Sequence, residues 1–137
     1  MKYVYKIMII DDDQEILELL ESALLKHVSL NLKINKYDSA EDGFSSCSKY
    51  KYDLIITDYK MPGMDGFSFI KTFRAFMGDV STPIIFLSGF FRQLEAVSRA
   101  SEFYNVIFYD KPFEGKKIAN KVFLLLLGKK EASSILS

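Results

Sequence analysis

The sequence is poor in three residue types: it has one cysteine, one histidine and no tryptophan in 137 residues. The single cysteine, Cys47, cannot form a disulfide within the chain, and no histidine or second cysteine lies near it at the spacing of a zinc site. These absences exclude a disulfide-stabilised fold and a Cys/His zinc module. Since an unpaired cysteine is typical of proteins from reducing compartments, we expect a cytoplasmic protein.

The chain also lacks a long hydrophobic run and an excess of one charge. Its longest uninterrupted apolar run, residues 122–127, has six residues, whereas a membrane-spanning helix needs about 18 or more. The apolar N-terminal segment ends in the aspartates at 11–13 and shows no signal-peptide cleavage site. Basic and acidic residues number 18 each, without a basic block, which disfavours binding to phosphate-rich nucleic acids. We therefore expect neither a membrane nor direct nucleic acid as a partner.

What is present is the composition of one ordinary globular domain. Hydrophobic residues make up 49% of the chain and charged residues 26%, so a chain of this length can build a core without disulfides or structural metal. We predict one domain over residues 1–128 and a C-terminal tail at 129–137. Because so little sequence follows the domain, we expect no output domain, unless the chain is a fragment of a longer one.

Strand and helix patterns alternate along the chain. Five apolar, β-rich segments predict strands at residues 3–10, 32–37, 54–57, 84–87 and 106–109. Helices are predicted at 14–27, after the N-caps Ser39 and Asp65, at 92–101, and from about 112 to 127, where Gly128 is expected to end the last one. This alternation predicts an α/β fold with a five-stranded parallel sheet and helices on both faces, since parallel strands need crossover connections.

Chemically active side chains follow the predicted strands. Aspartates 11–13 follow the first strand, Asp58 the third, Ser88 the fourth and Lys111 the fifth. In a parallel sheet these strand ends share one edge, where open α/β folds place their binding sites. Converging carboxylates repel one another, so the cluster indicates a bound cation, and oxygen ligands favour Mg²⁺. A carboxylate beside Mg²⁺ and a lysine can act as a nucleophile toward phosphorus.

Four motifs occur in order: IMIIDDD at 7–13, DLIITDYKMPGMDG at 53–66, PIIFLSG at 83–89 and FYDKPF at 108–113. Each is modest alone, but their joint occurrence is highly specific. Through them the chain resembles the receiver domain of bacterial two-component response regulators, and is similar to the single-domain chemotaxis type. The resemblance covers roughly residues 6–127. It implies a flavodoxin-like, doubly wound (βα)5 fold with strand order 2-1-3-4-5.

The resemblance also assigns the acceptor and its metal ligands. It makes Asp58 the phosphoacceptor and Asp11 with Asp12 the acidic pair that holds Mg²⁺. Asp12 is expected to bind the ion directly and Asp11 partly through water. Lys60, two residues after the acceptor, would contribute its backbone carbonyl to the metal.

The remaining roles that the resemblance implies concern the phosphoryl group and the response to it. Ser88 would hydrogen-bond a phosphoryl oxygen, and Lys111 would form an ion pair with the phosphate. Phe108, three residues before Lys111, takes the place of the aromatic switch residue, which moves inward after Ser88. The Lys111-Pro112 peptide is expected to be cis.

These roles predict a phosphorylation switch that assists its own phosphorylation and dephosphorylation but is not an enzyme. The phosphoryl group would come from a sensor histidine kinase or a phosphotransfer protein. A downstream protein target would bind the face built from the fourth helix, fifth strand and fifth helix. The apolar stripe at 122–127 is open to two interpretations, a buried helix or part of a partner or homodimer surface on this face.

Three alternatives remain at the level of sequence. The chain could be a phosphorylation-independent receiver-fold binding module, although retention of the full acceptor set argues against this. It could be the receiver fragment of a larger regulator or hybrid kinase. A Mg²⁺-dependent phosphatase with an Asp-x-Asp nucleophile fits the acids at 11–13, but Gln14 and Glu15 break the rest of that motif. Asp13 itself is better explained as the dipole partner of a helix start than as a metal ligand.

Overall fold

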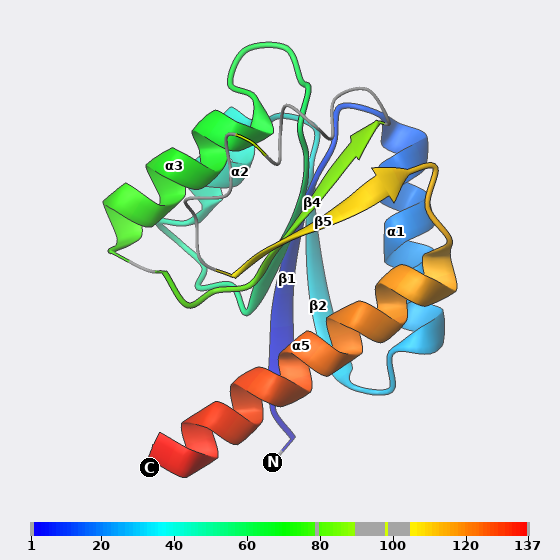
Figure 1. The fold of residues 1–137 in the computed structure, drawn as a ribbon, viewed down its shortest axis with the longest axis vertical. Helices are drawn as coiled ribbons and strands as arrows, with labels where there is room; N and C mark the ends of the chain where they lie inside the picture. Colours follow the sequence, from blue (N-terminus) through cyan, green and yellow to red (C-terminus); the bar gives the residue numbers. More distant parts are fainter. Residues whose placement is uncertain (1, 79, 90–97, 99–104, 137) are drawn as a thin grey trace.

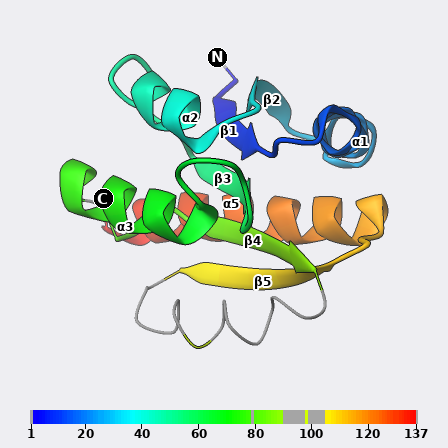
Figure 2. The same ribbon diagram turned by 90° about the horizontal axis from the view of Figure 1, so that it is seen from above.

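The computed structural model describes residues 2–78, 80–89, 98 and 105–136, and its centre is a five-stranded sheet (Figure 1). The strands are β1 (Val4–Ile10), β2 (Asn31–Tyr37), β3 (Leu54–Asp58), β4 (Ile84–Gly89) and β5 (Val106–Lys111). Their order is β2-β1-β3-β4-β5, and every neighbouring pair is parallel. The predicted strand number, direction and doubly wound order are confirmed, with the outer strands β2 and β5 visible in Figure 2.

Helices cover both faces of the sheet. Those in the described part of the chain are α1 (Gln14–His27), α2 (Ala40–Ser46), α3 (Gly66–Met77) and α5 (Gly115–Leu136). Helices α2 and α3 lie on one side of the sheet, and α1 and α5 lie on the other (Figure 1). The helix predicted over residues 92–101 falls almost entirely outside the described residues.

Side-chain caps determine where the helices begin. Ser39 accepts a hydrogen bond from the amide of Asp42 at 3.1 Å, and Asp65 accepts one from the amide of Ser68 at 2.8 Å. Each cap satisfies an amide that has no partner within its own helix. The predicted starts of α2 and α3 are therefore confirmed, as are both ends of α1.

The core is divided into two layers by the sheet. Ile7 and Ile9 of β1 pack in the layer under α1 and α5, and Met8 and Ile10 pack in the layer under α2 and α3. All four are at most 1% exposed. A strand buried on both faces needs apolar side chains at consecutive positions. Burial on both faces explains the uninterrupted apolar runs, and the close packing of these side chains holds the strand ends rigidly in place.

The prediction that Gly128 ends the last helix is wrong. Helix α5 begins at Gly115 and continues through Gly128 to Leu136. A glycine inside a helix costs only about 1 kcal/mol relative to alanine, and it ends a helix only where the chain adopts a left-handed cap. Although α5 has 22 residues, no helix in the described ranges is long and apolar enough to span a bilayer.

A substitution at Gly66 tests how closely the start of α3 packs against the end of β3. A Cβ atom at Gly66 would collide with the carbonyl oxygen of Asp58, and the Gly66 amide donates to the Tyr59 carbonyl at 2.8 Å. Because backbone cannot yield as a side-chain tip can, Gly66→Ala is expected to lower the free energy of unfolding by about 1–3 kcal/mol. Gly128→Ala, where a Cβ meets nothing within 4 Å, should raise it by up to about 1 kcal/mol. Urea unfolding of both variants checks this, and a similar effect at the two sites would contradict it.

Candidate functional site

The carboxyl ends of four strands bring the predicted site residues to one edge of the sheet. Asp11 directly follows β1, Asp58 ends β3, Ser88 is the penultimate residue of β4, and Lys111 ends β5. In the sheet register Asp58 lies opposite Leu87, one residue before Ser88. The parallel strand order thus places residues from four distant parts of the chain side by side.

Three carboxylates form a cluster at this edge. One oxygen atom each from Asp11, Asp12 and Asp58 lies within 4.8 Å of the other two. Asp11 and Asp58 are 1% and 6% exposed, whereas Asp12 is exposed to solvent. Two buried negative charges at this separation repel one another, so the cluster needs a compensating positive charge.

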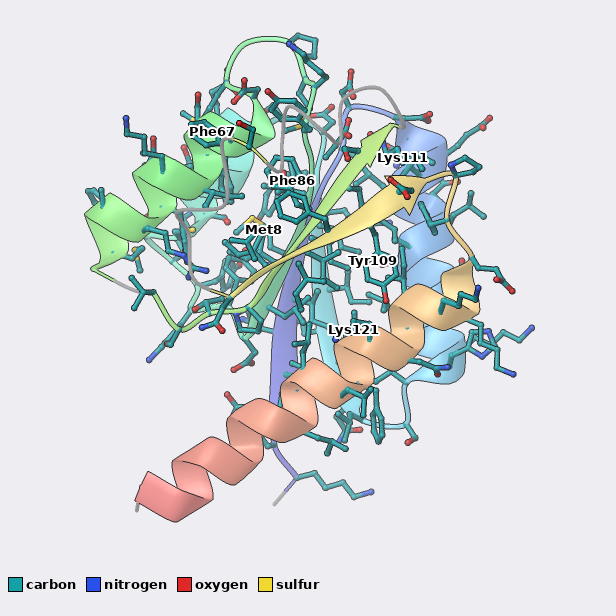
Figure 3. All side chains as sticks on the ribbon, viewed as in Figure 1. Met8, Phe67, Phe86, Tyr109, Lys111 and Lys121 are labelled. Atoms are coloured by element: carbon teal, nitrogen blue, oxygen red, sulfur yellow. The ribbon has the colours of Figure 1, made fainter. Side chains whose placement is uncertain are left out.

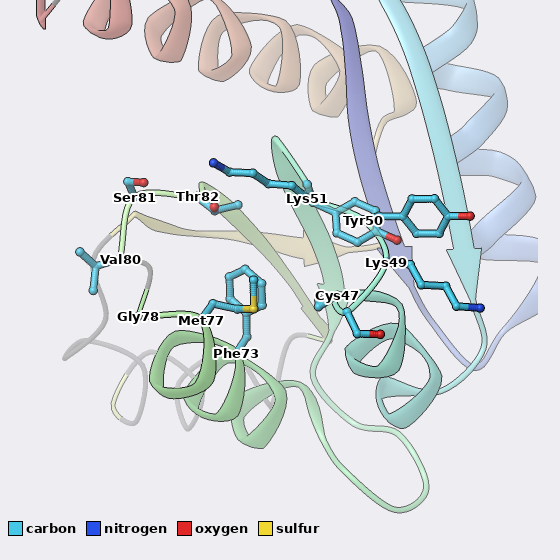
Figure 4. Close-up of a pocket in the computed structure, with 12 residues that line it drawn as sticks. Cys47, Lys49, Tyr50, Lys51, Phe73, Met77, Gly78, Val80, Ser81 and Thr82 are labelled. Atoms are coloured by element: carbon cyan, nitrogen blue, oxygen red, sulfur yellow. The ribbon is translucent and has the colours of Figure 1, made fainter.

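Lys111 supplies one such charge from the neighbouring edge of the sheet. Its Nζ lies 2.8 Å from Oδ2 of Asp11 and 3.1 Å from Oδ1 of Asp58. Figure 3 shows Lys111 at the carboxyl end of β5, close to the tip of β4. The Lys111-Pro112 peptide bond is cis, as predicted. The ammonium group therefore bridges the two buried carboxylates.

The directions in which the pKa values of Asp58 and Lys111 shift indicate that Lys111 only partly compensates the negative charge at this site. Burial raises the pKa of Asp58 and the charge of Asp11 raises it further, while Lys111 and the Tyr59 amide act in the opposite direction. Burial by itself would lower the pKa of Lys111, but its contacts with Asp11 and Asp58 reverse the direction and raise it. The ionised Asp58 is thus less favourable in the folded protein than in water, and an added cation would relieve it.

Asp13 belongs to the start of α1. Its Oδ1 accepts a hydrogen bond from the Glu15 amide at 2.9 Å, so it is the N-cap of this helix. Its own amide donates to Oδ1 of Asp11, also at 2.9 Å. This geometry agrees with the interpretation of Asp13 as a helix-start residue. It also orients the buried carboxylate of Asp11.

A hollow of about 500 Å³ opens over the carboxylates. Its lining comprises Asp11, Asp12, Asp13, Asp58, Lys60, Met61, Pro62 and Lys111. Met61 and Pro62 were not predicted from the sequence. The sequence feature that could have identified them is their position in the DYKMPG segment, directly after the predicted acceptor.

Ser88 carries a buried hydroxyl group. The side chain is fully buried, and its Oγ makes no hydrogen bond within the described part of the chain. An unsatisfied buried hydroxyl is costly, and such groups in native proteins often serve a site. The hydroxyl is therefore free to bond a group that enters this edge of the sheet.

Phe108 lies apart from the carboxylates. It is half-buried on β5 and packs in the core layer under α2 and α3, with its ring centroid 5.6 Å from that of Phe86. The structure therefore brings together Asp11, Asp12, Asp58 and Lys111, and it places Phe108 in the neighbouring core. The switch role of Phe108 remains a prediction.

The donor set fits a hard divalent cation. The three clustered carboxylates offer oxygen ligands of the kind that Mg²⁺ prefers, and the cluster opens to solvent through Asp12. Mg²⁺ commonly keeps several waters and binds one or two carboxylates, which a shallow open site permits. The three carboxylates at this edge of the sheet therefore fit a Mg²⁺ ion as a donor set.

Comparison with known proteins places this chain in one family. The family model for the response regulator receiver domain matches residues 7–123. The cell cycle response regulators CtrA of Brucella ovis and Brucella anthropi are each 29% identical over 121 residues, which is 88% of this chain and 50% of theirs. The chain thus spans about half the length of these curated relatives.

Solved structures show the same fold. A response regulator receiver domain from Clostridium thermocellum superposes with a TM-score of 0.79 at 21% identity, covering 93% of this chain and 98% of that one. A response regulator receiver protein from Sinorhizobium medicae superposes with a TM-score of 0.76 at 25% identity, covering 90% and 94%. The chain belongs to the response regulator receiver domain family and is a receiver domain of two-component signal transduction.

The raised pKa of Asp58 generates a stability prediction for the metal-free protein. Because the folded state holds the Asp58 proton more tightly than the unfolded state, ionised Asp58 destabilises the fold at pH values above its folded pKa. Asp58→Asn is therefore expected to raise the free energy of unfolding at pH 7. The gain should shrink as the pH falls toward the unfolded pKa, about 3.9.

Urea unfolding in the presence of a chelator at pH 7 and pH 5 measures this difference. Asp42→Asn serves as the control, since Asp42 lies on the exposed first turn of α2, outside the hollow. A loss of stability in Asp58→Asn at pH 7 would show that the ion pair with Lys111 outweighs burial and repulsion.

Proposed function

We propose that this receiver domain is a phosphorylation switch in which Asp58 accepts a phosphoryl group from the phosphohistidine of a kinase or phosphotransfer protein. The observation that carries the proposal is the cluster of Asp58, Asp11 and Lys111 at the floor of an open hollow. A carboxylate held beside a lysine and a second carboxylate has the charge arrangement that phosphoryl transfer requires.

In the transfer step, a carboxylate oxygen of Asp58 attacks the phosphorus atom. The new O–P bond forms while the P–N bond of the phosphohistidine breaks, and the bonding electrons leave with the histidine nitrogen. The Lys111 ammonium already contacts Asp58, so it is placed to pair with the incoming phosphoryl oxygens. The buried hydroxyl of Ser88 donates a hydrogen bond to one of them, which satisfies a group that has no partner among the described residues.

The carboxylates of Asp11, Asp12 and Asp58 would hold Mg²⁺, with the backbone carbonyl of Lys60 as a further ligand. When bound, the ion neutralises negative charge on the phosphoryl oxygens. The solvent-exposed Asp12 gives the site an open side, and the buried Asp11 is held in orientation by the Asp13 amide. In this arrangement the carboxylate oxygens stay close together in spite of their mutual repulsion.

The signal is read as a change on the surface near β5. As Ser88 turns toward the phosphoryl group, Phe108 packs more deeply, and the predicted partner face, which includes β5 and α5, changes for a protein partner. The added charge thereby biases a two-state element. A second copy of the chain could use the same face as a downstream protein does.

The phosphoryl group ends on the chain itself, so the protein acts once per phosphorylation event and is not an enzyme with an external substrate. It assists its own phosphorylation and dephosphorylation through the same residues. We place it in the cytoplasm, where the free thiol of Cys47 would remain reduced.

Phosphorylation of the purified chain is the direct test. Incubation with Mg²⁺ and phosphoramidate, a small donor with a P–N bond, should add one phosphoryl group by intact-mass spectrometry. Asp58→Asn should show none, Asp42→Asn should match the wild type, and omission of Mg²⁺ should abolish the reaction. The adduct should be lost in hydroxylamine, as an acyl phosphate is. An unmodified, folded wild type would instead favour a phosphorylation-independent binding module.

Thermal unfolding tests the metal ligands separately from the transfer. Mg²⁺ at about 100 times its Kd should stabilise the wild type by about 2.7 kcal/mol, because it binds only the folded state. Asp12→Asn removes one ligand but leaves the ion pairs of Lys111 in place. A tenfold loss of affinity should remove about 1.3 kcal/mol of this gain. Asp42→Asn should keep the full gain. Equal Mg²⁺ stabilisation in the two variants would exclude Asp12 as a ligand.

A further inference from the structure

Three aromatic rings lie in a row between the acceptor strand and the edge strand. Tyr59 follows Asp58, Phe86 is on β4, and Phe108 is on β5. The ring centroids of Tyr59 and Phe86 are 5.4 Å apart, and those of Phe86 and Phe108 are 5.6 Å apart. Phe86 also pairs with Phe108 in the sheet register. The row therefore crosses the sheet from the phosphoacceptor side to the predicted switch residue.

All three rings lie on the same face of the sheet. They pack in the core layer under α2 and α3, where Tyr59 and Phe86 are fully buried and Phe108 is half-buried. Figure 3 shows Phe86 on the α3 side of the sheet and Tyr109 on the α5 side. Ser88 is two residues after Phe86 on β4, and alternation along a strand gives it the same face. Close packing leaves buried rings little room to move independently.

The Tyr59 amide links this row to the acceptor carboxylate. It lies 2.8 Å from Oδ1 of Asp58 and 3.0 Å from the carbonyl oxygen of Leu87 on β4. The donor is thus shared between the acceptor side chain and the strand that carries Phe86 and Ser88. A bond to a charged carboxylate is stronger than one to a neutral oxygen. Formation of the acyl phosphate moves the negative charge from the carboxylate to the phosphoryl oxygens. The Asp58 oxygen that accepts from this amide then becomes a weaker acceptor, so the amide shifts toward Leu87.

We propose that Tyr59 and Phe86 form an aromatic relay that positions Phe108 according to the state of Asp58. The inference rests on the proposed phosphorylation switch and adds a second route to Phe108, besides the movement of Ser88. The shift of the Tyr59 amide moves its ring against Phe86, and Phe86 moves against Phe108. Phe86 is a positioning residue, because it acts on Phe108 through the ring contacts between Tyr59, Phe86 and Phe108.

The absence of tryptophan from the sequence allows a direct test. In a Phe108→Trp background, the only tryptophan reports the burial of side chain 108. Addition of Mg²⁺ and beryllofluoride, a phosphoryl analogue, should shift its emission. Phe86→Leu in this background should abolish most of the shift and weaken beryllofluoride binding about fivefold or more, the usual range of coupling between sites. Phe86→Met, which keeps the volume but removes the ring, should act in the same direction and serves if Phe86→Leu fails to fold.

Phe69→Leu is the matched control, since Phe69 is fully buried in the same core layer but stacks on Phe73, with centroids 6.0 Å apart. It should retain the shift. A full shift in folded Phe86→Leu and Phe86→Met, an equal loss in Phe69→Leu, or no shift in the background would each overturn the relay. Intact-mass spectrometry separates the two proposals: Phe86→Leu should still be phosphorylated on Asp58, whereas an unmodified wild type would refute the switch itself.

Discussion

The site depends on the ion pairs that the ammonium group of Lys111 forms with two buried carboxylates. Asp11 and Asp58 come from the central strands β1 and β3, and Lys111 comes from the edge strand β5. The three groups meet only if β4 separates β3 from β5 and all strands run in the same direction. The ion pairs therefore require the doubly wound sheet, and the sheet in turn requires the apolar layers on both of its faces.

The same arrangement holds charged and polar groups at this edge of the sheet at an energetic cost. Burial and the charge of Asp11 raise the pKa of Asp58 in spite of Lys111. The negative charge of Asp58 thus lowers the stability of the folded protein, and the rigid packing of the neighbouring strands offsets this cost. The buried hydroxyl of Ser88, which has no hydrogen-bond partner in the part of the chain that the structure describes, is a second cost at the same edge. A bound cation and a phosphoryl group would remove both costs. Occupation of the site would therefore also stabilise the folded protein.

Sequence patterns predicted the fold well where the structure is determined locally. Both ends of α1 were correct because an amphipathic repeat lies between a capping aspartate and an extended residue, Val28. The end of α5 was wrong because a glycine alone does not stop a helix, and whether it caps depends on the backbone conformation that follows. The positions of Asp11, Asp12, Asp58 and Lys111 at the strand ends were predictable because each ends or closely follows an apolar strand segment.

The sequence by itself determined which residues stand at the strand ends, since strand periodicity and turn residues are properties of neighbouring positions. Only the tertiary structure decided which of them meet. Lys111 pairs with Asp11, 100 residues away, and the Tyr59 amide is shared between a side chain and another strand. Tyr59, Phe86 and Phe108 form a row only after β3, β4 and β5 pair in register. Such contacts depend on the order and register of strands, which the packing of the whole chain selects and no local pattern records.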